Sequence, residues 1–130
     1  MRRDPGSNYT MTEVYAAASV GASTVYSDSV NHRDGSAVSF LISCGTWATS
    51  FVATVQHSSD DGVVDTYADE ADATMGNDVS LTLTEAGSGV LNVPNPREQY
   101  SRVKFVLGGT CVFACFAVLG PKKQVIPTDA

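Results

Sequence analysis

Residues 37–62 read AVSFLISCGTWATSFVATVQHSSDDG and contain two runs in which every second side chain is apolar. The apolar positions are Val38, Phe40, Ile42 and Cys44 in the first run and Phe51, Ala53 and Val55 in the second. Period-two alternation places one set of side chains on each sheet face, so each run predicts a strand with one apolar face. We expect the two strands to form a hairpin, with a tight connection at Gly45 and a closing turn at Asp61 and Gly62.

A lone two-stranded hairpin is marginal in water, so the rest of the chain is expected to supply more strands and a second layer. Short alternating runs separated by Gly, Pro and Asp turns predict further strands over residues 13–20, 23–30, 63–67, 78–84, 90–93, 101–107 and 111–119. The spacing predicts an all-β, two-sheet β-sandwich of jelly-roll type; an immunoglobulin-like strand order stays open, although its Cys–Trp–Cys arrangement is not present. We expect a flexible N-terminal arm over residues 1–12, the sandwich over 13–120 and a polar tail over 121–130.

The final run, residues 111–119, is apolar at both parities, unlike the strands before it. A strand of this kind is either central in a two-layer body or has its outer face against a partner. Gly108 and Gly109 precede it, and we expect them to form a hairpin turn with the strand over 101–107.

The composition argues against several partners. The chain has 130 residues, enough for one domain with an ordinary core, and carries 8 Lys and Arg against 14 Asp and Glu for a net charge of -6. Nucleic-acid binding relies on Lys and Arg to replace counterions on phosphates, so we expect no nucleic-acid surface. The N-terminus lacks an apolar run and residues 110–120 are too few to span a bilayer, so we expect synthesis in a cytoplasm and no membrane partner.

Three cysteines also fit a reducing compartment. Cys111 and Cys115 lie on one predicted strand at a separation of about 13 Å. A disulfide needs Cα atoms within about 7 Å, so we expect these two thiols to stay free, and Cys44 to be a small buried hydrophobe like them.

No residue pattern predicts catalysis. His57 is followed by Ser58, Ser59 and Asp60, but neighbours along a strand point to opposite faces and do not form a catalytic triad. A phosphate-binding loop and a metal-spaced Cys/His cluster are also missing from the sequence, so we expect no catalytic residue, cofactor or metal.

Two further features have both a binding and a structural interpretation. Acidic side chains offer the oxygen ligands that Ca²⁺ takes, but without EF-hand spacing, so a solvated acidic loop is the favoured interpretation. These acidic residues are Asp65, Asp69, Glu70, Asp72 and Asp78. Trp47 either stacks on a ligand at a loop or, as we favour, closes one end of the core.

The segment from Thr49 to Leu119 resembles a recurring type of small tailed-phage virion protein. The matching features are a strand ending in VQHSSDDG, then VSLTLTEAGSGVLNV, then QYSRVKFVLGGT and a last apolar strand. Proteins of this appearance tend to be β-sandwich capsid decoration or cement proteins, which bind outside the major capsid lattice as dimers or trimers. The resemblance therefore implies a structural role in the virion with two partners, the phage major capsid protein and other copies of this chain.

Candidate contact residues follow from the arm and from the last strand. The arm carries Arg2, Arg3, Tyr9, Met11 and Tyr15, which can order on a partner or add to a sheet edge. On the last strand, we expect the side chains of one face to contact the lattice or another copy. That face carries either Phe113, Cys115, Ala117 and Leu119 or the residues that alternate with them. The alternative function is a carbohydrate-binding or tail-fibre-associated module, with an aromatic platform built from Trp47 and Tyr67 or Tyr100.

Overall fold

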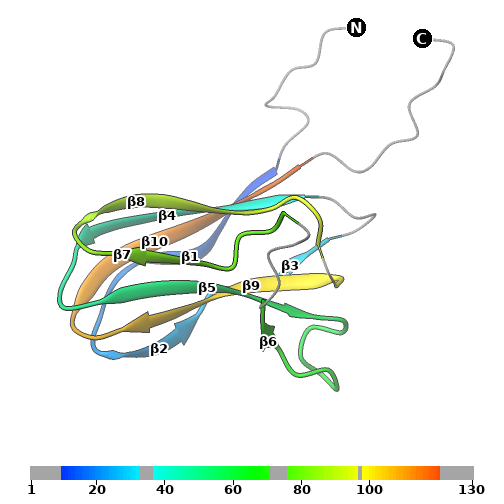
Figure 1. The fold of residues 1–130 in the computed structure, drawn as a ribbon, viewed down its shortest axis with the longest axis horizontal. Helices are drawn as coiled ribbons and strands as arrows, with labels where there is room; N and C mark the ends of the chain where they lie inside the picture. Colours follow the sequence, from blue (N-terminus) through cyan, green and yellow to red (C-terminus); the bar gives the residue numbers. More distant parts are fainter. Residues whose placement is uncertain (1–9, 33–36, 71–75, 97, 121–130) are drawn as a thin grey trace, which may run out of the picture.

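Two antiparallel sheets pack face to face in the computed structural model, which describes residues 10–32, 37–70, 76–96 and 98–120 (Figure 1). The first sheet has the order β1 (Thr10–Val20), β10 (Cys111–Leu119), β4 (Val38–Thr46) and β8 (Gly87–Val93). The second has the order β2 (Ser23–Tyr26), β9 (Tyr100–Leu107), β5 (Phe51–Ser58) and β6 (Ala68–Asp69), with β3 (Val30–Asn31) on β9 and β7 (Ser80–Leu83) on β5. The described residues form no helix, and so none long and apolar enough to cross a membrane.

The connectivity confirms the predicted jelly-roll sandwich. The chain passes from one sheet to the other between β1 and β2, β3 and β4, β4 and β5, β7 and β8, β8 and β9, and β9 and β10. Each sheet therefore alternates strands from distant parts of the sequence, with β10 between β1 and β4 and β9 between β2 and β5. This interleaving of strands between the two layers, one of four strands and one of six, is the arrangement of a jelly roll.

The predicted hairpins are wrong. β4 pairs with β10 and β8, whereas β5 pairs with β9, β7 and β6, so the two alternating runs share no ladder. Their apolar faces meet across the sandwich instead of lying side by side, and residues 47–50, with Thr49 at a φ of 65°, carry the chain between layers. Gly108 and Gly109 likewise join β9 of one sheet to β10 of the other.

The alternation nevertheless predicted the buried faces correctly. The buried apolar residues include Val38, Phe40, Ile42 and Cys44 of β4, Phe51, Ala53 and Val55 of β5, and Val103, Phe105 and Leu107 of β9. Phe113 of β10 connects the layers, with ring centroids 4.7 Å from Phe105 and 5.1 Å from Phe51 across the interface. Such tilted and edge-on ring pairs add to the stabilisation from burial alone.

Several boundaries differ from the sequence prediction. The strand expected over 23–30 ends at Tyr26, with β3 following at Val30, and the strand expected over 90–93 begins already at Gly87. β1 begins at Thr10, so the last residues assigned to the arm are already paired with β10. Residues 63–67, expected to form a strand, lie in a loop, and only the short β6 follows it. The loop forms because side chains rather than a neighbouring strand bind its backbone amides, as described below.

The three cysteines are free and buried, as predicted. Burial raises the pKa of the Cys115 thiol to about 12 and also raises the pKa of Cys44. Because the thiolate is the reactive species, these side chains act as small apolar residues of the core.

Candidate binding surfaces

A loop between β5 and β6 is held by the carboxylate of Asp60. The backbone amides of Val63, Val64 and Asp65 donate to its oxygens at 3.1, 2.9 and 3.1 Å. Asp favours turns because its short side chain reaches amides a few residues ahead. One carboxylate thereby replaces the ladder that a strand over these residues would have formed.

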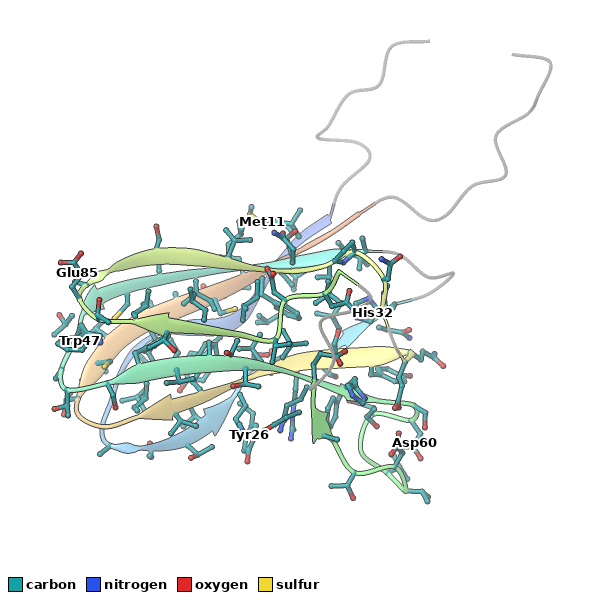
Figure 2. The ribbon with its side chains drawn as sticks, viewed as in Figure 1. Met11, Tyr26, His32, Trp47, Asp60 and Glu85 are labelled. Carbon is teal, nitrogen blue, oxygen red and sulfur yellow. The ribbon has the colours of Figure 1, made fainter. Side chains whose placement is uncertain are left out.

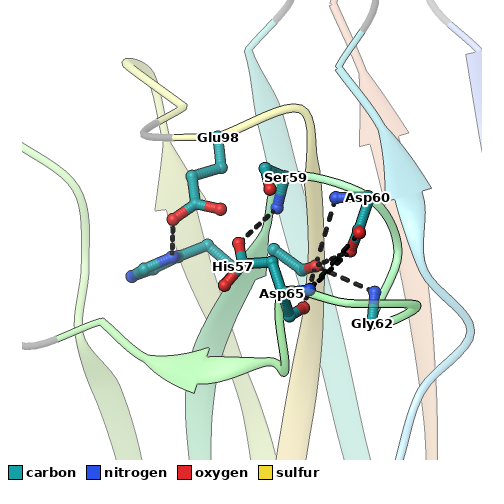
Figure 3. A network of polar contacts seen from close by, with 7 residues as sticks. His57, Ser59, Asp60, Gly62, Asp65 and Glu98 are labelled. Carbon is teal, nitrogen blue, oxygen red and sulfur yellow. Dashed lines mark hydrogen bonds and ion pairs between the residues drawn. The ribbon is translucent and has the colours of Figure 1, made fainter.

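The Ser58 side chain also binds the backbone of this loop. Its hydroxyl is fully buried, accepts from the amide of Gly62 at 2.8 Å and donates to the carbonyl of Asp65 at 2.6 Å. The amide of Ser59 donates to Asp65 Oδ2 at 2.8 Å, which closes the loop on itself (Figure 3). The backbone of residues 58–65 is therefore fixed by its own polar groups.

His57 and two acidic side chains form a polar contact beside this loop (Figure 3). His57 Nδ1 lies 3.0 Å from Glu98 Oε1, whereas Glu98 Oε2 is buried and has no hydrogen-bond partner among the residues that the structure describes. The carboxyl of Asp65 faces it, and this contact raises the pKa of Glu98 and lowers the pKa of Asp65.

The outer face of the second sheet is organised by Arg102. Its guanidinium lies between two aromatic rings, 4.1 Å from the ring centroid of Tyr26 and 4.0 Å from that of Tyr67. Arg102 Nε donates to Gln56 Oε1 at 2.8 Å, and Gln56 Nε2 donates to Asp69 Oδ1 at 2.8 Å. A planar guanidinium suits this position because it stacks on rings and donates in its own plane at once.

A pocket of about 270 Å³ opens beside this stack. It is lined by Ser27, Ser29, Asp61, Gly62, Thr66, Tyr67 and Arg102. The Tyr67 hydroxyl donates to Asp61 Oδ1 at 2.7 Å, and burial together with this bond raises the pKa of Tyr67. The pocket thus presents hydroxyls, one carboxylate and one guanidinium to solvent.

The outer face of the first sheet is chemically different. Its apolar side chains, called the apolar face below, are Leu41 of β4, Val90 of β8, and Val112, Ala114, Phe116 and Val118 of β10. Phe116 pairs in register with Leu41, and Leu41 with Val90, so three apolar side chains lie side by side across three strands. The other outward residues of β4 and β8 are Ser39, Ser43, Ser88 and Asn92, so the outward residues of β4, β8 and β10 carry no charge.

The structure separates the residues predicted to contact partners. Phe113 and Cys115 are 1% and 0% exposed, because their parity of β10 faces the core, and this removes them from any surface. The alternate parity of β10 is the outward one. Leu119 is half-buried and packs against the core. Met11 is 62% exposed and lies beside Val118.

Tyr15, expected to belong to the arm, packs in the core. Its ring stacks on Phe113 at 4.8 Å between centroids, with the planes 9° apart. Arg2, Arg3 and Tyr9 lie outside the described residues, as do the polar tail and Asp72.

The aromatic platform of the alternative function is not assembled. Trp47 is half-buried against the core, and its Nε1 donates to the carbonyl of Leu83 at 2.9 Å, in agreement with the favoured interpretation. Figure 2 shows Trp47 and Asp60 at opposite ends of the sandwich. Tyr67 lies at the Asp60 end, because its hydroxyl donates to Asp61, the next residue in the chain. Trp47 and Tyr67 therefore cannot contact one ligand.

The acidic residues also have separate partners. Asp69 Oδ2 lies 2.8 Å from Lys104 Nζ, whereas Asp78 Oδ2 accepts from the amide of Asn92 at 2.7 Å. Within the described part of the chain, no three metal-ligating side chains come together.

Sequence reasoning missed the roles of Asp60, Glu98 and Arg102. The Asp-rich turn after the second alternating run was a signal for the first of them, because Asp caps turns of this kind. Glu98 is 41 residues from His57, and no local pattern connects the two. No protein-family model matches the chain, and a search of curated proteins finds no significant relative.

Proposed function

We propose that this chain is a structural virion protein that binds the outside of a phage major-capsid lattice, in association with other copies of itself, and stabilises the head. The observation that carries the proposal is the apolar face, whose side chains on β4, β8 and β10 carry no charge and which is bordered by the exposed Glu13 of β1, in register with Phe116. Contiguous apolar surface rimmed by polar residues marks a protein interaction site. The sequence resemblance to capsid decoration proteins supports the capsid lattice as the partner that we propose.

The physical logic is surface burial rather than chemistry. A sheet face is rigid, so little conformational entropy is lost when it docks. On a symmetric shell the same contact repeats at every equivalent position, and each interface of 1,000 Å² or more, the approximate minimum for a specific contact, adds to the stability of the head.

The test is cosedimentation of the purified protein with heads of its phage assembled without it, together with its solution mass from light scattering. Wild-type protein should pellet with heads. Leu41→Asp places a charge in the centre of the apolar face and should weaken attachment or self-association by at least about 100-fold, because an unpaired buried charge costs several kcal/mol.

Thr54→Asp is the matched control. Thr54 is half-buried on the outer face of the second sheet, in register with Lys104, so the new charge should be tolerated and leave both readouts unchanged. If the folded Leu41→Asp variant pellets and associates like wild type, the apolar face is not the contact surface.

A second candidate function, a carbohydrate-binding module, is favoured by the pocket beside Arg102. Hydroxyl, carboxylate and guanidinium groups around a tyrosine are the groups that hydrogen-bond sugar hydroxyls. Calorimetric titration with a panel of oligosaccharides tests it, with Arg102→Met as the variant that removes the donors. Heat of binding that disappears in this variant supports the module, whereas no heat with wild type rejects it.

A further inference from the structure

We propose that Val63 and Val64 form an anchor that inserts into an apolar depression with a basic rim on a partner protein. Val63 is 80% exposed and Val64 is 86% exposed, the highest values among the exposed large hydrophobic residues that the structure describes. Single exposed valines are ordinary, but here two adjacent ones protrude from the tip of one loop.

The loop is organised before any partner arrives. Asp60 accepts the amides of both valines, and Ser58 and Asp65 hold the flanking backbone. These bonds occur although neither valine packs against the core. A fixed backbone lowers the entropy lost on binding, which is the property that a docking loop needs.

Charge selects the kind of partner. Residues 58–70 contain five acidic residues and no Lys, Arg or His. Asp61 is exposed beside Gly62 at the same tip, and the lowered pKa values of Asp61 and Asp65 keep both carboxylates ionised at neutral pH. An anionic membrane repels such a tip, whereas a protein surface with Lys or Arg around an apolar depression complements it.

The anchor and the apolar face are separate surfaces. The apolar face lies on the outer side of the first sheet, and the anchor extends from the end of the second (Figure 1). This inference rests on the proposed function, under which the partner surface is the capsid lattice. The anchor then adds a second contact to the lattice, at a place separate from the apolar face.

The experiment compares wild-type protein with the double variant Val63→Ser/Val64→Ser in cosedimentation with heads assembled without the protein. Both valines are exposed, so the variant should keep its melting temperature while its affinity falls by at least about 30-fold, the loss expected for two apolar side chains left in water. Raising the salt concentration should weaken wild-type binding, because it screens the acidic tip from the basic rim.

Val106→Ser is the control for removing an exposed apolar group, since Val106 lies on the outer face of β9 and should leave attachment unchanged. Asp60→Ala keeps both valines but frees the loop, and should weaken attachment without removing an apolar contact.

Each outcome decides a different claim. Equal pelleting of wild type and the double variant overturns the anchor and leaves the proposed function standing. Wild-type protein that ignores heads overturns the proposed function and the lattice as partner. Wild-type protein that instead floats with phosphatidylcholine vesicles, through Val63 and Val64, overturns the protein partner in favour of a membrane.

Discussion

The outer faces of the two sheets differ in the side chains that cover them: polar and aromatic groups that contact one another on the second sheet, and apolar groups on the first. On the second sheet, Arg102 lies between Tyr26 and Tyr67, and its neighbours Gln56 and Asp69 complete a connected set of contacts. On the first sheet, the row formed by Phe116, Leu41 and Val90 has no such polar set. Figure 2 shows the two faces through Met11 and Tyr26, which lie on opposite sides of the sandwich.

This difference indicates which face offers a partner more binding free energy. Polar groups that already bond to each other offer a partner little, because binding must break those bonds or leave them buried. Apolar groups offer the free energy of their own burial, about 25 cal/mol per Å². For this reason the outer face of the first sheet is the one proposed for docking.

The largest expected change in the free energy of unfolding tests which side chains of β10 face the core and which face outward. Phe113→Ala should lower the free energy of unfolding by about 3–5 kcal/mol, because it leaves a cavity between the sheets. Phe116→Ala, on the apolar face, should cost about 1 kcal/mol or less and weaken association instead. Urea denaturation followed by Trp47 fluorescence measures both, and similar losses for the two variants would contradict the assigned parity.

A smaller change in the free energy of unfolding tests whether the contacts of Arg102 stabilise the outer face of the second sheet. Arg102→Lys keeps the charge but loses the planar stack and the bond to Gln56, and should cost about 1–2 kcal/mol of unfolding free energy. Val112→Thr on the apolar face should change stability by about 0.5 kcal/mol at most. Equal effects in urea denaturation would show that the stack contributes nothing beyond ordinary surface contacts.

A third effect concerns pH and separates Glu98 from ordinary surface carboxyls. Its raised pKa means that the folded state holds the proton more tightly, so this contribution to stability is present at low pH and is lost as pH rises through the folded pKa. Asp65, with a lowered pKa, contributes in the opposite sense, and its share is lost as pH falls through its own folded pKa.

Glu98→Gln removes the group with the raised pKa, so the loss of stability as pH rises should disappear. The effect should be smaller than that of Arg102→Lys, because the Glu98 side chain is 26% exposed. Melting temperatures from pH 4 to pH 8 measure it. Glu85→Gln, at an exposed turn, removes the same type of side chain and should leave the pH profile of wild type in place. An unchanged profile in Glu98→Gln would show that Glu98 does not contribute to the pH dependence of stability.

The smallest effect concerns the salt bridge between Lys104 and Asp69. The Asp69 side chain is 48% exposed, so Lys104→Gln should cost about 0.2–1 kcal/mol at low salt. The cost should shrink in 0.5 M NaCl, because exposed charges are screened. A loss that persists at high salt would mean that Lys104 acts through packing.

The sequence by itself determined the fold class and the buried face of most strands. Alternation in the segments of Phe40, Phe51 and Phe105 predicted inward positions that the structure confirms, because period two is a local property of an extended backbone. It could not choose the outward parity of β10, where both faces are apolar, so Phe113 was proposed for a surface that Phe116 occupies.

Only the tertiary structure decided which strands pair and which polar groups meet. β4 and β5 look like a hairpin, yet each pairs with strands from distant parts of the chain, because two apolar faces are buried as well across a sandwich as side by side. Glu98 meets His57, and Arg102 meets Tyr26, through contacts between residues far apart in the sequence. Such contacts depend on the packing of whole layers, which no local periodicity encodes.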